Sequence, residues 1–366
     1  MENILKSYVA QKGLMSLAEF MQICLSHPTH GYYMRSDVFG KQGDFTTAPE
    51  INQMFGEIIG LWLVDCMAKL PHEPEFNLIE LGPGRGTLMA DILRSMAKFK
   101  GKAKVNIHMV EISPKLTEMQ RKKLAKFEPN IHWHKDLDEL KSAINSAPCI
   151  FLANEFFDAL PIAQYEFLDD QWFERMVGEK AGKIVPTLSM KPAQPNLPDI
   201  LKNRAADGAI FEDSPASLYY LDKILAILKT NQGIALIIDY GHDGHGFGDT
   251  LQAVKNHEYA KIFENLGSQD ITAHVNFTAL TERAQAQNIV ANPVVTQAKF
   301  LNDLGIGLRA QMLIRKNPDK KLEISEALNR LVAEDEMGNL FKVMALHYFD
   351  HKDIKSQFTP AGFGLE

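Results

Sequence analysis

The sequence predicts an α/β protein whose core is a parallel β-sheet with helices between its strands. Two observations support this prediction. Short apolar runs alternate with single helical segments through residues 75–155, which is the pattern of repeated βαβ units. The first of these runs ends in a glycine-rich turn, at residues 82–86, that leads directly into a helix. Because the chain shows no internal repeat or low-complexity tract, we expect one elaborated domain.

The expected elements follow in order along the chain. Residues 1–70 form a helix-rich N-terminal and lid region, in which Thr47 and Glu50 have the spacing of a capping box that opens a buried helix. Residues 71–366 form the predicted core. Its first insert holds four prolines, which suggest a hairpin and irregular structure. The inserts are expected at about 163–200 and 250–277, the strands at 76–81, 104–111, 131–134, 148–155, 233–239 and 341–349, and the helices at 87–100, 113–127, 136–145 and 214–230.

Composition and charge narrow the class of protein. The chain has 39 Lys and Arg residues against 46 Asp and Glu residues, a net charge of −7, which argues against a protein built to hold nucleic acid or an anionic membrane surface. Its three cysteines match no metal motif, so we predict no metal site and a reducing compartment. The N-terminus does not resemble a signal peptide, and no apolar run approaches the roughly 18 residues of a membrane helix. We therefore expect a cytoplasmic protein without membrane insertion.

The glycine-rich turn is the first candidate binding feature. The first strand runs into Glu80-Leu81-Gly82-Pro83-Gly84-Arg85-Gly86-Thr87, directly before a helix. Glycines allow a ligand to approach the backbone closely, and the helix N-terminus behind them offers free N–H groups. The dinucleotide fingerprint requires a third glycine where this sequence has Thr87, so that pattern fails. The spacing Glu-x-Gly-x-Gly-x-Gly instead resembles motif I of class I S-adenosylmethionine-dependent methyltransferases.

Two further acids follow the next strands. Glu111 ends the second strand, where an acid accepts the hydroxyls of a ribose in nucleotide-binding folds. Asp136 follows the third strand, where methyltransferases often place an acid near the adenine amino group. Both residues also have a structural interpretation, because Glu111 can cap the next helix and Asp136 can begin one. We favour a nucleotide-like ligand, since strand, turn, helix and acid occur in this order.

Two segments of the chain are distinctive. They are Gly43-Asp44-Phe45-Thr46-Thr47-Ala48-Pro49-Glu50 and Asn154-Glu155-Phe156-Phe157-Asp158-Ala159-Leu160-Pro161. Together with residues 80–88, 110–114, 239–241 and 269–277, they resemble the MidA family over nearly the whole chain. One member of that family is a mitochondrial complex I assembly factor and protein arginine methyltransferase.

The resemblance implies a class I methyltransferase fold of Rossmann-like type. It would comprise a mostly parallel seven-stranded sheet, a helical N-terminal addition and inserts. The resemblance also implies S-adenosylmethionine as cofactor, arginine methylation of a protein substrate and a respiratory complex I subunit as partner. Combined with the residues above, it assigns the cofactor site to Glu80, Gly82, Gly84, Gly86, Glu111, Asp136 and Asn154.

The candidate catalytic residues leave the fourth strand. A guanidinium has a pKa of about 12.5 or higher and a delocalised lone pair, so a fork of carboxylates is expected to hold it and concentrate electron density on one nitrogen. Glu155 and Asp158 are the candidates, because ligands bind at the carboxyl ends of strands in this fold. The alternative is that Glu155 orients a loop and Asp158 caps a turn. A lid or substrate clamp is expected from Asp44, Phe45, Thr47 and Glu50.

Two other functions stay open at this point. The chain can be a non-catalytic assembly chaperone with a structural methyl-donor site, or a methyltransferase for a small molecule. Fold alone does not separate these functions, because function resides in the site. The sequence makes no prediction of the oligomeric state.

Overall fold

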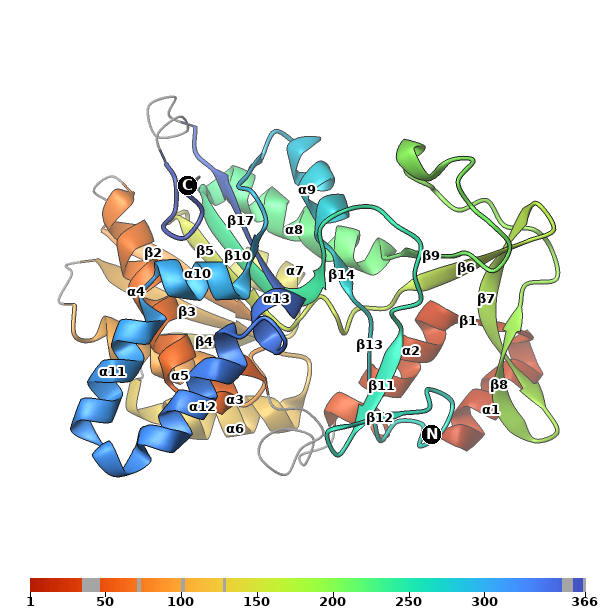
Figure 1. Cartoon of the computed structure of the whole chain (residues 1–366), viewed down its shortest axis with the longest axis horizontal. Helices are drawn as coiled ribbons and strands as arrows, with labels where there is room; N and C mark the ends of the chain where they lie inside the picture. The colour runs from red at the N-terminus through yellow and green to blue at the C-terminus, as the bar shows by residue number, and fades with distance from the viewer. Residues whose placement is uncertain (35–46, 71–73, 100–102, 128–129, 351–357, 365–366) are drawn as a thin grey trace. The chain divides into compact units, whose positions relative to one another are not determined.

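The computed structural model describes residues 1–34, 47–70, 74–99, 103–127, 130–350 and 358–364 (Figure 1). The chain divides into two compact units. The first unit is drawn from residues 1–45, 157–220 and 243–280, and the second from residues 46–156, 221–242 and 281–366. Both units are therefore assembled from segments that are distant in sequence.

The core of the second unit is a mostly parallel sheet, with its strands in the order β15-β17-β10-β5-β2-β3-β4 (Figure 1). The strands from β10 to β4 are parallel to one another, whereas β17 runs antiparallel to both β10 and β15. Strand order reverses at β2, which has β3 on one side and β5 on the other. The strands are β2 (Glu75–Leu81), β3 (Lys104–Val110), β4 (Ile131–His134), β5 (Cys149–Asn154), β10 (Gly233–His242), β15 (Val290–Ala291) and β17 (Phe341–Tyr348), and β16 (Val295–Thr296) also pairs with β17.

The central strands are continuous apolar runs because helices cover both faces of such a sheet. Every residue of β10 from Gly233 to Gly241 is buried, and so are the first five residues of β5. The edge strand β4, in contrast, exposes His132. The helices of this part of the chain are α3 (Ala48–Ile51), α4 (Met54–Lys69), α5 (Thr87–Met96), α6 (Pro114–Leu124), α7 (Leu137–Ala143), α8 (Pro215–Asn231), α9 (Phe277–Gln285), α10 (Gln297–Asp303), α11 (Ile306–Lys316), α12 (Lys321–Val332) and α13 (Met337–Leu340).

Helices α4 and α5 pack unusually closely because α4 carries two glycines on one face. A Cβ atom on Gly56 would lie 2.6 Å from Cβ of Asp91, and one on Gly60 would lie 2.0 Å from Oγ of Ser95. Carbon atoms in contact normally stand about 3.5–4.0 Å apart. The absence of side chains at these two positions therefore sets the distance between the helix that follows the glycine-rich turn and its neighbour.

The first unit combines N-terminal helices with two antiparallel sheets. One sheet has the order β1-β7-β6-β9, with β8 beside β7, and the other has the order β12-β11-β13. Helix α2 begins with a capping box formed by Ser16 and Glu19, and Phe20 and Ile271 lie in the unit's apolar core. The elements are α1 (Glu2–Lys12), β1 (Met15–Ser16), α2 (Leu17–Ser26), η1 (Tyr32–Met34), β6 (Ala163–Leu168), β7 (Gln171–Lys180), β8 (Lys183–Leu188), β9 (Ile210–Asp213), β11 (Gln252–Lys255), β12 (Glu258–Ala260), β13 (Asp270–Thr272) and β14 (Val275–Asn276).

The predicted fold class is confirmed, and each predicted strand and helix of the core has a counterpart. The first insert contains both expected parts: residues 163–188 form three antiparallel strands, β6 to β8, with Pro186 inside the outer strand β8, and residues 189–198, which hold the other three prolines, are irregular. Residues 1–45 of the predicted N-terminal region belong to the first unit and 46–70 to the second. That residues 1–70 act together as a lid region stays a prediction. Among the residues described, no helix is long and apolar enough to cross a membrane.

Candidate active site

The glycine-rich turn lies at the carboxyl end of β2, where the strand order reverses. Gly82, Gly84 and Gly86 have φ angles of 58°, 50° and 72°, which L-residues with a side chain rarely adopt. A Cβ atom on Gly82 would meet the Phe156 ring at 3.0 Å, and one on Gly86 would meet the Gln120 side chain at 3.3 Å. Gly86 is also the N-cap residue of α5. The turn thus leaves main-chain groups and a helix N-terminus where ligands of open α/β sheets bind.

Glu111 immediately follows β3 and is linked to this turn. Its carboxylate accepts hydrogen bonds from the Ser113 N–H at 2.8 Å and from Nε2 of Gln120 at 3.1 Å. The same Gln120 nitrogen donates to the carbonyl of Gly84 at 2.7 Å. Burial raises the pKa of Glu111 to about 7, and the hydrogen bonds from Ser113 and Gln120 oppose this rise. Glu111 is thus poised to ionise near neutral pH at a fixed position.

Glu80, inside β2, is a buried acid that remains unsatisfied. Its side chain is 3% exposed, and Oε2 has no hydrogen-bond partner among the residues that the structure describes. Burial and then the nearby charge of Glu111 raise the pKa of Glu80 to about 8. Within the same described part of the chain, Oδ1 of Asn154 at the end of β5 is also buried without a partner. Buried polar groups normally have partners, so these two oxygens fit a site whose ligand supplies the donors.

Asp136 begins a helix, which is the structural role that the sequence analysis gave as an alternative. It is the N-cap residue of α7, and its Oδ1 accepts hydrogen bonds from the N–H groups of Asp138 at 2.9 Å and Glu139 at 2.8 Å. These bonds satisfy two of the free donors at the start of the helix. The capping role does not test the predicted contact with adenine, which stays a prediction.

Glu155 adopts a strained backbone at the end of β5. Its φ angle is 50°, which is uncommon for a residue other than glycine. Oε1 accepts hydrogen bonds from the N–H of Ala48 at 3.0 Å and from Nδ2 of Asn154 at 3.1 Å. Because Ala48 is the first residue of α3, Glu155 caps that helix from a distant part of the chain. The carboxylate is therefore held in one orientation beside the turn.

Asp239, in β10, is a site residue that the sequence analysis did not single out. It is fully buried, and its carboxylate accepts hydrogen bonds from the N–H groups of Phe156 at 3.1 Å and Tyr240 at 3.0 Å. These bonds fix the backbone that follows β5, where Glu155 lies. The signal in the sequence was an acid inside an otherwise apolar strand.

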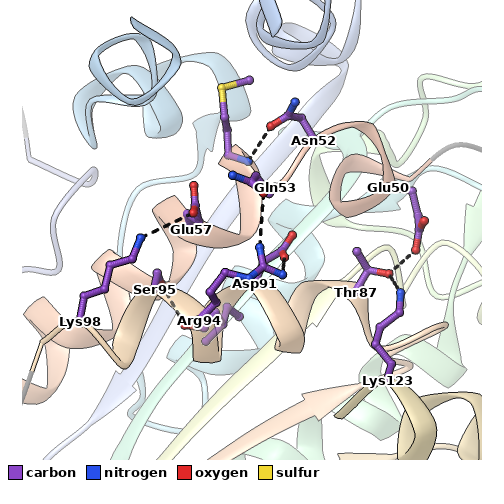
Figure 2. A network of polar contacts seen from close by, with 12 residues as sticks. Glu50, Asn52, Gln53, Glu57, Thr87, Asp91, Arg94, Ser95, Lys98 and Lys123 are labelled. Atoms are coloured by element: carbon purple, nitrogen blue, oxygen red, sulfur yellow. Dashed lines mark hydrogen bonds and ion pairs between the residues drawn. The ribbon is translucent and has the colours of Figure 1, made fainter. Parts of the chain in front are cut away.

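Of the predicted lid residues, Asp44 and Phe45 lie outside the described residues. Thr47 is the N-cap residue of α3, but the capping box predicted between Thr47 and Glu50 does not form. The Glu50 carboxylate instead accepts a hydrogen bond from the Thr87 hydroxyl (Figure 2), and its Oε2 lies 3.7 Å from Nη1 of Arg85. The Lys123 ammonium donates to the same hydroxyl. Glu50 thus binds the first turn of α5 rather than its own helix.

A second polar network fixes α4 against its neighbours, and Figure 2 shows the part of it formed by Glu57, Lys98 and Arg94. Arg309 of α11 donates two hydrogen bonds to the buried Glu57 carboxylate, from Nε at 2.6 Å and from Nη2 at 3.0 Å. Lys98 lies 3.9 Å from the same carboxylate. Arg94 pairs with Asp91 at 2.8 Å within α5. The glycine-rich turn leads into α5. These contacts therefore stabilise helices α4 and α5 behind the site.

Asp158, the second candidate catalytic acid, belongs to the first unit, whereas Glu155 belongs to the second. Asp158 is 7% exposed, and its main-chain carbonyl accepts a hydrogen bond from the N–H of Ala273 at 3.0 Å. Its charge contributes, after burial and Asp270, to the raised pKa of Tyr33, whose hydroxyl donates a hydrogen bond to Asp270 in the same unit.

The glycine-rich turn at the reversal of strand order, together with an acid after the next strand, is the arrangement of a class I S-adenosylmethionine-dependent methyltransferase. Comparison with known proteins agrees. Residues 58–294 match the model of a family described as “Putative S-adenosyl-L-methionine-dependent methyltransferase”, and the chain belongs to this family. The chain is an S-adenosylmethionine-dependent methyltransferase, and the resemblance to the MidA family is confirmed.

Individual relatives match over most of the chain. A protein of Danio rerio named protein arginine methyltransferase NDUFAF7, mitochondrial, is 33% identical over 93% of this chain and 85% of its own. The Caenorhabditis elegans homolog of that protein is 33% identical over 100% of this chain and 91% of its own. A crystal structure from Burkholderia thailandensis with bound S-adenosyl-homocysteine has a TM-score of 0.83 at 25% identity, covering 97% of this chain and 94% of the other.

The predicted cytoplasmic location is wrong. The relatives from Danio rerio, Caenorhabditis elegans and Drosophila melanogaster are all named as mitochondrial proteins. The prediction rested on the sparse cysteines and on the lack of a recognisable signal peptide or membrane helix. Sparse cysteines indicate a reducing compartment but do not distinguish one such compartment from another.

Proposed function

We propose that this enzyme methylates an arginine side chain of a protein and that the protein is a subunit of respiratory complex I. The relatives named protein arginine methyltransferases support the acceptor class. The observation that carries the proposal is the geometry of Glu155, a carboxylate held on a strained backbone at the end of β5. The neighbouring Phe156 packs against the glycine-rich turn, which supports a position of Glu155 beside the turn that we propose receives the donor.

The residues at the carboxyl ends of β2 to β5 fit a methyl donor. In this proposal the turn of Gly82, Gly84 and Gly86 receives the donor, Glu111 accepts its ribose hydroxyls, and Asp136 contacts its adenine. Glu80 and Asn154, with their unsatisfied buried oxygens, accept its remaining polar hydrogens. When bound, S-adenosylmethionine supplies a methyl group activated by the positive charge on sulfur.

The carboxylates prepare the acceptor. Glu155 holds the guanidinium by charge-assisted hydrogen bonds and orients one nitrogen, and Asp158, three residues further along the chain, stays the predicted second acid of the pair. As positive charge reaches that nitrogen, an adjacent carboxylate accepts the proton that leaves it. Thr47 and Glu50 remain the predicted lid residues within the described part of the chain, and their part would be to exclude water, which matters because catalysis of methyl transfer consists mostly of positioning.

The test uses the purified protein and a methyl-labelled donor. We would incubate it with complex I isolated from cells that lack this protein and identify the labelled residue by mass spectrometry. We expect methylarginine on one subunit, with turnover lost in the Glu155→Gln and Asp158→Asn variants while calorimetry shows unchanged donor binding. Asp222→Asn, at a half-buried acid outside the site that pairs with Arg283, is the matched control. Label on lysine or on small molecules only would refute the proposal.

A further inference from the structure

Helix α3 makes polar contacts near both of its ends, and the partners come from distant parts of the chain. At its first residue, the N–H of Ala48 donates a hydrogen bond to Oε1 of Glu155 at 3.0 Å. At its third residue, the Glu50 carboxylate accepts a hydrogen bond from the hydroxyl of Thr87, the first residue of α5 (Figure 2). All four residues belong to the second unit. Helix α3 therefore connects the residue that follows β5 to the helix that follows the glycine-rich turn.

The contact between α3 and α5 combines a hydrogen-bonded chain with an ion pair. The Lys123 ammonium donates to the Thr87 hydroxyl, which itself donates to Glu50. A hydroxyl can do both, because it carries one donor and two acceptor lone pairs. Oε2 of Glu50 also lies 3.7 Å from Nη1 of Arg85, and the Glu50 side chain is only 19% exposed. Salt and water therefore screen this contact less than they would on an open surface.

Helix α3 and Glu155 depend on each other. The helix has only four residues, and so short a helix is not stable in water without contacts to the rest of the protein. Glu155 has a φ angle of 50°, and a strained backbone of this kind persists only where its surroundings hold it. The bond from Ala48 supports both of them. If α3 lost its contact at Glu50, the Ala48 N–H would no longer be held against the Glu155 carboxylate.

We propose that α3 sets the position of the Glu155 carboxylate relative to the glycine-rich turn, and that Glu50 and Thr87 are the positioning residues that hold α3 in place. The role of Glu155 toward the acceptor rests on the proposed function, which this inference deepens. Methyl transfer requires the acceptor nitrogen and the methyl carbon to stand about 3–3.5 Å apart, and a misplacement of about 1 Å can cost about a hundredfold in rate. A fixed link between the acid and the turn meets that requirement.

The first experiment needs no turnover. Amide hydrogen exchange, measured by NMR on the whole protein with S-adenosylhomocysteine, reports the bond from Ala48 to Glu155 directly. Thr87→Val removes the hydroxyl at nearly constant shape and should make the Ala48 amide exchange at least tenfold faster. Thr87→Ser keeps the hydroxyl and should leave the exchange rate unchanged. Thr117→Val, the same substitution on α6, is the matched control and should also change nothing.

Glu50→Ala breaks the same link from the other side. It should accelerate exchange at Ala48 as Thr87→Val does. The double variant should exchange no faster than the faster single variant, because both substitutions remove one interaction. The amide of Ile92, fully buried in the middle of α5, serves as the internal reference and should keep its rate in every variant.

The second experiment measures turnover and donor binding on the same variants. Thr87→Val should lower kcat for methylation of complex I at least tenfold, while calorimetry gives the affinity of the unaltered protein for S-adenosylhomocysteine. Unchanged exchange at Ala48 in Thr87→Val would overturn the inference. Equal acceleration at Ala48 and Ile92, or a loss of donor affinity as large as the loss of turnover, would also overturn it, because each indicates a general structural role.

The two proposals can fail separately. If the unaltered protein forms no methylarginine, the proposed function is wrong, whereas exchange at Ala48 still decides whether α3 positions Glu155. If methylarginine forms but exchange at Ala48 does not respond to Thr87→Val, the proposed function stands and this inference is wrong.

Discussion

Because Glu111 is proposed to accept the ribose hydroxyls of the donor, we expect donor binding to depend on the pKa of Glu111 and therefore on pH. The ribose hydroxyls need an ionised acceptor, and burial raises the pKa of this carboxylate to about 7. Only the ionised fraction is competent, so the apparent Kd equals the intrinsic value divided by that fraction. The fraction is about 9% at pH 6 and about 91% at pH 8, and affinity should therefore rise about tenfold between these values. Glu111→Gln removes the titrating group and should flatten this part of the profile.

Calorimetric titration with S-adenosylhomocysteine at pH 6, 7 and 8 measures the effect. The amino group of the ligand also titrates in this range, so the relevant quantity is the difference between the two proteins at each pH. Glu111→Gln should also bind about tenfold or more weakly at pH 8, because a charge-assisted hydrogen bond contributes about 1.5–3 kcal/mol. Equal slopes for the two proteins would refute the argument that Glu111 is the titrating acceptor.

Two further predictions concern helices α4 and α5 behind the site. Gly56→Ala should lower the free energy of unfolding by about 1–3 kcal/mol, because its new Cβ would lie 2.6 Å from Asp91. Thermal unfolding measures this change, and the control Gly307→Ala, which has open space around the new Cβ, should leave stability unchanged. Arg309→Met should lower the free energy of unfolding in urea by about 3–5 kcal/mol, because it leaves the buried Glu57 carboxylate without its main partner. The double variant Glu57→Leu and Arg309→Met removes that buried charge as well and should regain most of the lost stability. No recovery in the double variant would contradict the explanation.

The sequence predicted the second unit well because its evidence is local. The strands β2 to β5 and their helices follow from hydrophobic runs, glycines and caps that lie within a few residues of one another. The first insert was harder, because Pro186 interrupts the alternation that identifies a strand. β8 tolerates this proline because it lies at the edge of its sheet, where, among the strands that the structure describes, it pairs with β7 alone.

The errors and omissions at the site share a different physical cause. Thr47 and Glu50 have the spacing of a capping box, but the Glu50 carboxylate interacts with Thr87 and Arg85 instead. A pattern of neighbouring residues does not show which of several possible partners a side chain contacts in the folded protein. The bond from Tyr33 to Asp270 is equally invisible in the sequence. Candidate residues can thus be predicted from strand ends, whereas their partners depend on the completed fold.

The position of β17 has a consequence for the order of folding. This strand comes last in the sequence, at Phe341–Tyr348, yet it lies between β10 and β15 inside the sheet. β10 ends at His242, about 100 residues before β17 begins. During synthesis, the edge of β10 that pairs with β17 therefore stays unpaired until those residues have been made. Unpaired strand edges are templates for aggregation. We expect the nascent chain to need a chaperone until its last residues emerge, and C-terminal truncation before Phe341 to yield insoluble protein rather than a smaller enzyme.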